Sequence, residues 1–242
     1  MSERDKELSL TQHLGEFRDR LMVASIAVII TTAISFAFTT DIIKLLILPA
    51  GEGLRLASFS PTENFTTYMR VALFTGIALA MPVLLYEIYA YIDPALHAHE
   101  RRFAITLGPF ILLLFAAGMS FCYFLVLPSA LKFLLGFASD VFDNQLRASE
   151  YIGFVTTFIL GMGIVFEMPV LIYALIRVGA VSRSWLAKQR RYFFLISFVV
   201  AAVVTPTPDP FNQSIVAIPI YLLFELGLFL GRFGGRRAAP ST

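Results

Sequence analysis

The chain has 242 residues, of which 57% are hydrophobic and 15% are charged, and its mean hydropathy is +0.76. A soluble domain carries about 25% charged residues, so this composition excludes an ordinary water-facing surface and indicates a membrane protein. The single cysteine, Cys122, excludes an internal disulfide and a metal site built from several cysteines. The net charge of +2 is less informative than the placement of the charges along the chain.

Six apolar runs predict membrane-spanning helices, which need about 20 mostly apolar residues each. The last two runs are short, and a polar turn signal, Thr205-Pro-Thr-Pro-Asp-Pro210, separates them. They could form one hairpin dipping into the bilayer, but this cluster is too polar for hydrocarbon, which favours two spans. The sequence therefore predicts one all-α membrane domain, residues 1–242, with six transmembrane helices over residues 21–40, 70–92, 103–127, 151–176, 192–204 and 214–230.

Lysine and arginine in the predicted loops set the orientation, because cytoplasmic loops carry an excess of both. The loops on one side hold 14 of the 19 basic residues, and those on the other side hold 5. This distribution predicts that both termini are cytoplasmic. The outer loops, residues 39–70 and 128–150, are long enough for short helices lying on the outer face. Asp41–Leu48, followed by Pro49, is typical of such a helix.

The three predicted spans that run from outside to inside, residues 70–92, 151–176 and 214–230, each contain a proline, namely Pro82, Pro169 and Pro219. Because proline removes a hydrogen bond and bends a helix, the pattern favours a cupped bundle. The alternative is that apolar helices share such prolines by chance, and it explains the pattern equally well. The same three spans are each interrupted by one carboxylate, Glu87, Glu167 or Glu225.

Glu167 is the carboxylate placed deepest in its predicted span, where insertion costs a few kcal/mol. Such a group usually has a function or faces a polar cavity; the alternative is a protonated glutamate that bonds to a neighbouring helix. Glu87 and Glu225 lie nearer the cytoplasmic ends, where a structural role is favoured.

Two further glutamates, Glu16 and Glu100, lie on the predicted cytoplasmic surface, Glu16 in a short amphipathic helix before the first span. They suit a basic ligand, because arginine pairs bidentately with carboxylate. From composition alone, pairing of Glu100 with its neighbours Arg101 or Arg102 is the stronger interpretation.

Enzyme chemistry finds little support in this sequence. The three histidines, His13, His97 and His99, lack a clear third ligand for a metal. No P-loop, Gly-x-Ser-x-Gly or His-Glu-x-x-His motif occurs. We therefore expect neither an enzyme nor a cofactor.

Five short motifs together resemble the TatC family of twin-arginine protein translocases, and they occur in order on the six predicted spans. They are His13-Leu-x-Glu-x-Arg-x-Arg-Leu21, Tyr91-Ile-Asp-Pro-Ala-Leu-x-x-His-Glu-Arg-Arg102, Phe166-Glu-Met-Pro169, Thr205-Pro-x-Pro-Asp209 with Asn212-Gln213, and Ala217-Ile-Pro-Ile-Tyr221-x-x-x-Glu225. The resemblance covers nearly the whole chain. Each motif is weak alone, but the set in this order is specific.

The resemblance implies a receptor in the prokaryotic cytoplasmic (inner) membrane that binds twin-arginine signal peptides of folded precursor proteins. It implies TatA-type and TatB-type single-span partners, self-association, export driven by the proton-motive force, and no nucleic-acid partner. Carried over by motif, the signal-peptide site comprises Glu16, Arg18, Tyr91, Glu100, Arg101 and Arg102, with Glu16 and Glu100 facing the arginine pair. Tyr91 stands where the family usually has phenylalanine.

The resemblance also implies that Glu167 is the buried polar group of a concave face. It places Thr205 and Gln213 in an outer polar cluster where partner helices dock. Short fifth and sixth helices would thin the bilayer locally and ease the passage of cargo. The rival interpretation is a small secondary transporter or ion permease with Glu167 as its proton or cation site, which predicts solute flux without partners. An intramembrane enzyme would need a facing catalytic pair, and the sequence offers none.

Overall fold

The computed structural model describes residues 10–51, 56–92, 98–136, 146–205 and 210–234, which are almost entirely helical. A 3₁₀ turn, Leu48–Ala50, follows the first helix, and a π-helical turn, Cys122–Val126, joins α3 to α4. The helices are α1 (Leu10–Ile47), α2 (Pro61–Ile92), α3 (Ala98–Phe121), α4 (Leu127–Gly136), α5 (Ala148–Phe166), α6 (Met168–Val178), α7 (Arg183–Lys188), α8 (Arg190–Val204) and α9 (Pro210–Gly234).

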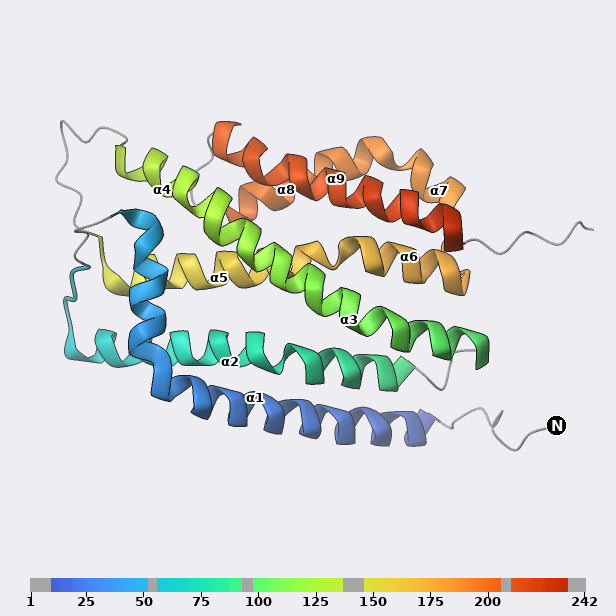
Figure 1. Cartoon of the computed structure of the whole chain (residues 1–242), viewed down its shortest axis with the longest axis horizontal. Helices are drawn as coiled ribbons and strands as arrows, with labels where there is room; N and C mark the ends of the chain where they lie inside the picture. Colours follow the sequence, from blue (N-terminus) through green and yellow to red (C-terminus); the bar gives the residue numbers. More distant parts are fainter. Residues whose placement is uncertain (1–9, 52–55, 93–97, 137–145, 206–209, 235–242) are drawn as a thin grey trace, which may run out of the picture.

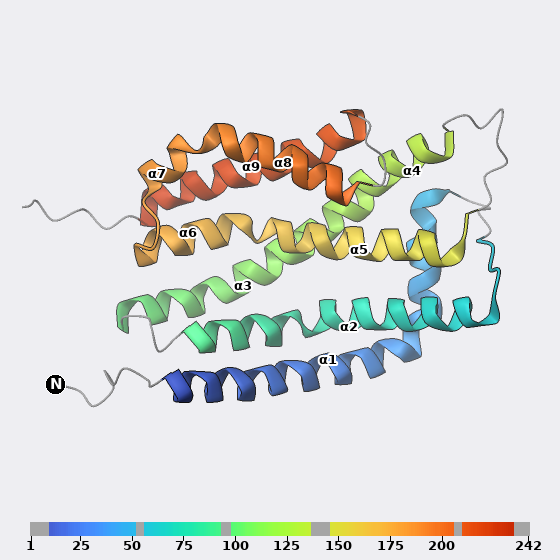
Figure 2. The ribbon, with the colours of Figure 1, turned by 180° about the vertical axis from the view of Figure 1, so that it is seen from behind.

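The long helices form a layer with one oblique helix on its face (Figure 1). Within the layer α1 packs on α2, α2 on α5, α6 on α9, and α9 on α8. Helix α3 crosses α5 obliquely, and seen from behind it lies beyond α5 (Figure 2). We call the end where α1 begins and α9 finishes the proximal end, and the end where α2 and α5 begin the distal end (Figure 1).

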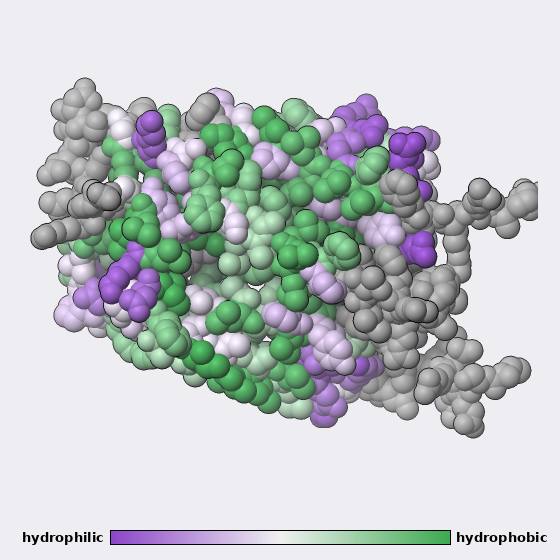
Figure 3. All heavy atoms as spheres, viewed as in Figure 1, coloured by the Kyte–Doolittle hydropathy of each residue, from purple (hydrophilic) through white to green (hydrophobic). Residues whose placement is uncertain are grey.

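The surface of this bundle is that of a membrane protein. Within the described ranges, five helical segments are long and apolar enough to cross a membrane: residues 14–50, 61–88, 108–136, 148–177 and 213–232. Large apolar side chains such as Ile29, Phe124 and Val203 are exposed. Apolar side chains cover the middle of the face in Figure 3, whereas polar ones gather toward both ends. Helix α8, which corresponds to the fifth predicted span, is shorter than these segments, and its 15 residues span about 22 Å.

Three predicted helices are longer in the structure than the sequence suggested. The segment containing Glu16 and the segment Asp41–Leu48 are not separate short helices but the two ends of the 38-residue α1, because no proline interrupts the chain before Pro49. Helix α1 instead changes direction near its distal end (Figure 1). The sixth span is not short either: α9 has 25 residues and begins at Pro210, which suits the first turn of a helix.

The fourth predicted span is divided where its carboxylate lies. Helix α5 ends at Phe166 and α6 begins at Met168, so Glu167 is the residue at the break. The following Pro169 has no N–H to donate, which removes one hydrogen bond from the helix at this point. The helix resumes at once, because the Leu171 N–H donates to the Glu167 carbonyl at 3.0 Å.

A hollow opens on the face that carries α3, and it has a cavity volume of about 390 Å³. The distal end of α1 bounds it on one side and α3 with the π-helical turn on the other, while α2 and α5 form its floor. Its lining is apolar apart from a few hydroxyl groups, and consists of Ile42, Leu45, Leu46, Phe74, Thr75, Ala78, Met119, Ser120, Tyr123, Phe124, Thr156, Ile159 and Leu160. The bundle is therefore hollowed on this face, in agreement with the cupped interpretation.

Helices α1 and α2 approach closely at Gly76. The Thr31 hydroxyl donates to the Gly76 carbonyl at 2.8 Å, a bond between the two helices. A Cβ at Gly76 would lie 2.7 Å from the backbone N and Cα of Thr32, so only glycine fits without moving a helix. Small residues allow such approach between membrane helices, where packing and hydrogen bonds replace the hydrophobic effect.

We therefore expect Gly76→Ala to lower the free energy of unfolding by about 1–3 kcal/mol, the usual cost of overpacking. Gly161 in α5 is the matched control, because a Cβ there meets no atom within 4 Å. Gly161→Ala should be neutral or raise stability by roughly 0.5–1 kcal/mol, since alanine favours a helix over glycine. Thermal unfolding in detergent measures both variants, and equal effects would contradict the close approach.

Candidate functional site

A cluster of three charged side chains joins α1 to α2 near the proximal end. The Arg20 guanidinium donates to Glu16 Oε1 from Nη2 at 2.6 Å and from Nε at 3.0 Å. Its remaining nitrogen, Nη1, donates to Glu87 Oε2 on α2 at 3.2 Å. The pairing within α1 follows from the four-residue spacing of Glu16 and Arg20, which lie on the same face of the helix.

This cluster is partly shielded and has one negative charge in excess. The exposed fractions of the Glu16, Arg20 and Glu87 side chains are 24%, 26% and 13%. Beside it the ring of Phe17 packs edge-on against that of Tyr91, with their centroids 5.7 Å apart. Two carboxylates that share one guanidinium beside aromatic rings form a surface suited to a further cation.

The other residues of the predicted signal-peptide site differ in where they lie and in how much of them the structure describes. Arg18 points into solvent and pairs with its neighbour Asp19 at 2.8 Å. Tyr91 lies in the last turn of α2. Glu100, Arg101 and Arg102 lie in the first turns of α3, and their side chains fall outside the part of the structure that is described. The structure therefore brings Glu16 and Tyr91 to the same proximal region, and it leaves the contacts of Glu100 open.

A second ion pair holds α8 against α9 near the proximal end. Arg190 donates to both carboxylate oxygens of Glu225, at 2.7 and 2.8 Å, and the Tyr221 hydroxyl donates to the same carboxylate at 3.1 Å. Glu225 and Glu87 therefore both pair across helices, in agreement with the structural role predicted for them.

Glu167 differs from these paired carboxylates. Both of its carboxylate oxygens are buried, and neither has a hydrogen-bond partner among the described residues. The nearest polar group that the structure gives is the Phe115 backbone on α3. A buried polar group without a partner costs about 1–3 kcal/mol, so its retention requires a compensating role. The group can take up a proton or receive a polar ligand.

Thr205 and Gln213 lie where the α8–α9 hairpin turns at the distal end, but their side chains are engaged within it. The Thr205 hydroxyl is buried and donates to the Ala201 carbonyl at 2.8 Å. The Gln213 amide donates to the Phe198 carbonyl at 2.9 Å, which ties α9 to α8. The sequence predicts polar groups available to a partner; in this structure the Thr205 hydroxyl bonds within the end of α8, and the Gln213 amide joins α9 to α8.

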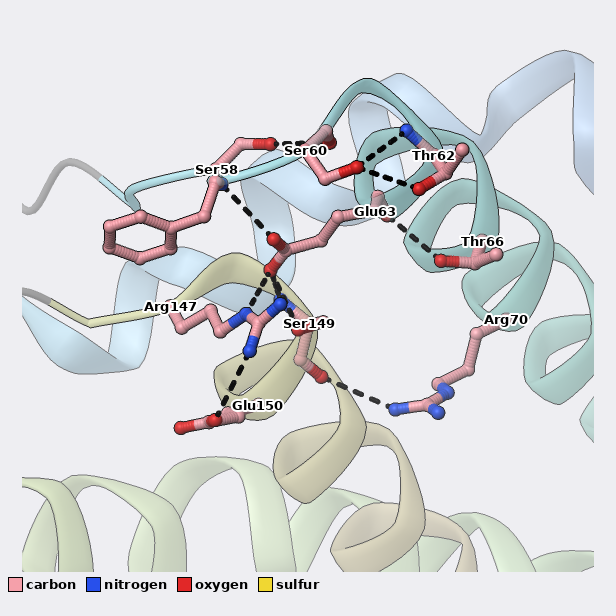
Figure 4. A network of polar contacts seen from close by, with 10 residues as sticks. Ser58, Ser60, Thr62, Glu63, Thr66, Arg70, Arg147, Ser149 and Glu150 are labelled. Atoms are coloured by element: carbon pink, nitrogen blue, oxygen red, sulfur yellow. Dashed lines mark hydrogen bonds and ion pairs between the residues drawn. The ribbon is translucent and has the colours of Figure 1, made fainter.

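The most extensive polar network lies at the distal end and was not predicted (Figure 4). Glu63, whose side chain is only 4% exposed, accepts hydrogen bonds from Arg147 Nε at 3.0 Å and from the Phe59 N–H at 3.1 Å. Ser149 donates to it twice, from its hydroxyl at 2.7 Å and from its N–H at 3.2 Å. The spacing Ser60-x-x-Glu63 before an apolar run is the sequence signal that could have revealed this helix start.

The network fastens the segment before α2 to the start of α5. Ala57 and Arg147 form an isolated β-bridge, in which the Ala57 N–H donates to the Leu146 carbonyl and the Ala148 N–H donates to the Ala57 carbonyl, both at 2.9 Å. The Glu63 carboxylate thus holds together two segments that are far apart in the sequence.

We expect Glu63→Gln to loosen this attachment, because an amide loses the ion pair with Arg147 and part of the accepting capacity. The Ala57 and Ala148 amides should then exchange with deuterium faster, as measured by mass spectrometry on the detergent-purified chain. Glu150→Gln is the matched control, since Glu150 is 76% exposed and lies 4.0 Å from Arg147. Unchanged exchange in Glu63→Gln would show that the bridge does not depend on this carboxylate.

Comparison with known proteins agrees with this geometry. Residues 12–219 match the family model described as Sec-independent protein translocase protein (TatC). The TatC protein of Desulforapulum autotrophicum is 37% identical over 241 residues, which cover 98% of this chain and 89% of that protein. The TatC protein of Aquifex aeolicus is 39% identical over 235 residues, which cover 95% of this chain and 97% of that protein.

Solved structures give the same result. A crystal structure described as that of the twin arginine translocase receptor TatC superposes with a TM-score of 0.80 at 39% identity, and covers 93% of this chain and 100% of that one. A second, of the same receptor in DDM, superposes with a TM-score of 0.81 and covers 90% of this chain. The chain belongs to the TatC family of Sec-independent protein translocase proteins.

Proposed function

We propose that this translocase protein receives the arginine pair of twin-arginine signal peptides at its proximal end, which faces the cytoplasm. The observation that carries the proposal is the partly shielded cluster in which Glu16 and Glu87 share the single guanidinium of Arg20. As a translocase protein, the chain acts in transport rather than as an enzyme. Its work is recognition, for which charge, shape and burial are sufficient.

Arginine fits this surface better than lysine does. A guanidinium offers a planar fork of donors that matches a carboxylate, and it also stacks on aromatic rings. Phe17 follows Glu16 directly in the chain and packs edge-on against Tyr91, so a peptide arginine bound to Glu16 would lie close to aromatic side chains. We place Glu100 as the acceptor for the second arginine, with Arg18, Arg101 and Arg102 flanking the two acids. The order of the motifs supports this assignment.

Both termini are proposed to be cytoplasmic, on the basis of the 14-to-5 distribution of basic residues. Ser58 and Ser184 are exposed at the distal and proximal ends, respectively. In a Cys122→Ala background, a membrane-impermeant thiol reagent applied to intact cells should label Ser58→Cys and leave Ser184→Cys unlabelled. The reverse pattern would overturn the orientation and move the recognition site to the other face.

The recognition site predicts a loss of affinity when its acids are removed. Charge-assisted hydrogen bonds are worth roughly 1.5–3 kcal/mol, or about ten- to a hundredfold in affinity. Glu100→Ala should weaken binding of a labelled twin-arginine peptide by about that factor, and Glu16→Ala by less, because Arg20 already occupies Glu16. Titration of the detergent-purified variants measures this.

Glu225→Gln serves as the control for these titrations, since it removes a carboxylate near the same end but in the α8–α9 pair. Its affinity should equal that of the unmodified chain. If the Glu16→Ala/Glu100→Ala double variant also binds normally, the two acids do not form the site.

The α8–α9 hairpin is proposed as the docking surface for TatA-type and TatB-type single-span partners. Apolar side chains of α8 are exposed, among them Leu195 at 61% and Val203 at 81%. The helix spans about 22 Å, whereas a hydrocarbon core is about 30 Å thick, so the bilayer should thin beside it. Thr205 and Gln213 lie at the distal end of this surface, where Gln213 joins α9 to α8. The same proposal includes self-association of this chain and export driven by the proton-motive force.

Glu167 is proposed as the intramembrane polar group that transport requires. Glu167→Met, of similar volume, should raise the free energy of unfolding by roughly 1–3 kcal/mol, since it removes a buried group without partners among the described residues. The same variant should impair export of a twin-arginine precursor. A variant that is more stable and still exports normally would show that the carboxylate has no role. Flux of protons or solutes through the purified chain alone would instead support the rival transporter.

A further inference from the structure

Arg20 occupies the carboxylate that the proposed function assigns to the incoming ligand. Two of its nitrogens, Nε and Nη2, meet Glu16 Oε1, which is the contact that a signal-peptide arginine would make. Its third nitrogen already reaches Glu87 on α2. One guanidinium therefore bridges two acids that belong to different helices, and only one of those acids is part of the proposed signal-peptide site.

We propose that Arg20 is an internal substitute for the signal arginine: it occupies Glu16 in the peptide-free receptor and moves fully to Glu87 when a peptide arginine binds Glu16. This proposal rests on the function proposed above and adds a step of regulation at the same site. Arg20 then sets the affinity of the site, although it does not itself have to contact the peptide.

The exchange keeps every charge paired. Removing one partner of a partly buried ion pair is costly, because the remaining charge loses both its solvation and its partner. Here one guanidinium replaces another on Glu16, so that carboxylate is never left alone. Arg20 retains Glu87, whose side chain is the least exposed of the three at 13%. The excess negative charge of the cluster is what leaves room for a second guanidinium.

The exchange also sets a threshold for binding. A ligand gains only the difference between its own contact with Glu16 and the one that Arg20 gives up. A lysine ammonium is a point charge that cannot reproduce the two-nitrogen contact, so it competes poorly with Arg20. A peptide arginine can reproduce that contact. The displacement of Arg20 costs the same free energy for either peptide, so Arg20 lowers both affinities by one factor and sets how strongly a ligand must bind Glu16.

The alternative is that Arg20 only braces α1 against α2. The two explanations predict opposite signs for removal of the side chain. If Arg20 only holds α1 against α2, its removal misplaces Glu16 and weakens peptide binding. If Arg20 competes with the peptide, its removal leaves Glu16 vacant and strengthens peptide binding. The ion pair of Arg190 with Glu225 provides a matched control, because it also joins two helices near the proximal end but lies outside the proposed site.

The test is a titration of the detergent-purified full chain with a labelled twin-arginine peptide and with its two-lysine counterpart. Arg20→Gln should raise the affinity for the twin-arginine peptide by about two- to fivefold, the range expected for a partly exposed ion pair, and should raise the affinity for the two-lysine peptide by a similar factor. Arg20→Lys, which keeps the charge and a link to α2, should raise the affinity for the twin-arginine peptide by a smaller factor. Arg190→Gln should leave both affinities unchanged.

Glu87 supplies the decisive comparison. Glu87→Gln should lower the affinity for the twin-arginine peptide by about two- to fivefold, because the displaced Arg20 then has no acceptor. In the Arg20→Gln background the same change should have no effect. Weaker or unchanged binding by Arg20→Gln, or an effect of Glu87→Gln that persists without Arg20, overturns the exchange while the proposed function stands. Absence of peptide binding by the unmodified chain overturns both.

Discussion

Hydrocarbon solvates neither an ion nor an unpaired backbone group, and the arrangement of this chain follows from that constraint. A helix forms the hydrogen bonds of its backbone N–H and C=O groups within itself. Among the described residues the ion pairs lie toward the two ends of the bundle, where water can reach them, and apolar side chains cover the middle (Figure 3). Charges near the ends can therefore do two things at once: they join helices to one another, and they remain available to ligands from the aqueous phase.

The same constraint explains why the carboxylates have different roles. Glu63 and Glu225 have partners that belong to the fold, so they stabilise the distal and proximal ends. Glu16 has a partner that a ligand can replace, because it lies at the proximal surface and shares Arg20 with a second acid. Glu167 has no partner among the described residues and lies at the break between two helices. The cost of burying it makes it a candidate for a role beyond packing.

The sequence predicted the helices well and their contacts poorly, for physical reasons. An apolar run of about 20 residues identifies a span because length and composition alone decide it, so the helical content and the short α8 could be predicted. The continuity of α1 could have been read from the absence of proline, but its change of direction depends on packing. Arg20 pairs with Glu16 four residues away, which is a local pattern. Its bond to Glu87 is 67 residues distant and follows only from the close approach of α1 and α2.

The central claim is that the arginine pair of a signal peptide binds among the acids of the proximal end, and crosslinking tests it most directly. A twin-arginine peptide with a photoreactive side chain next to the arginine pair is bound to the detergent-purified chain and irradiated, and the attached residues are mapped by mass spectrometry. We predict attachment to the first turns of α1 and α3, around Glu16 and Glu100. Attachment concentrated at the distal end, around Glu63, or along α8 would contradict the claim.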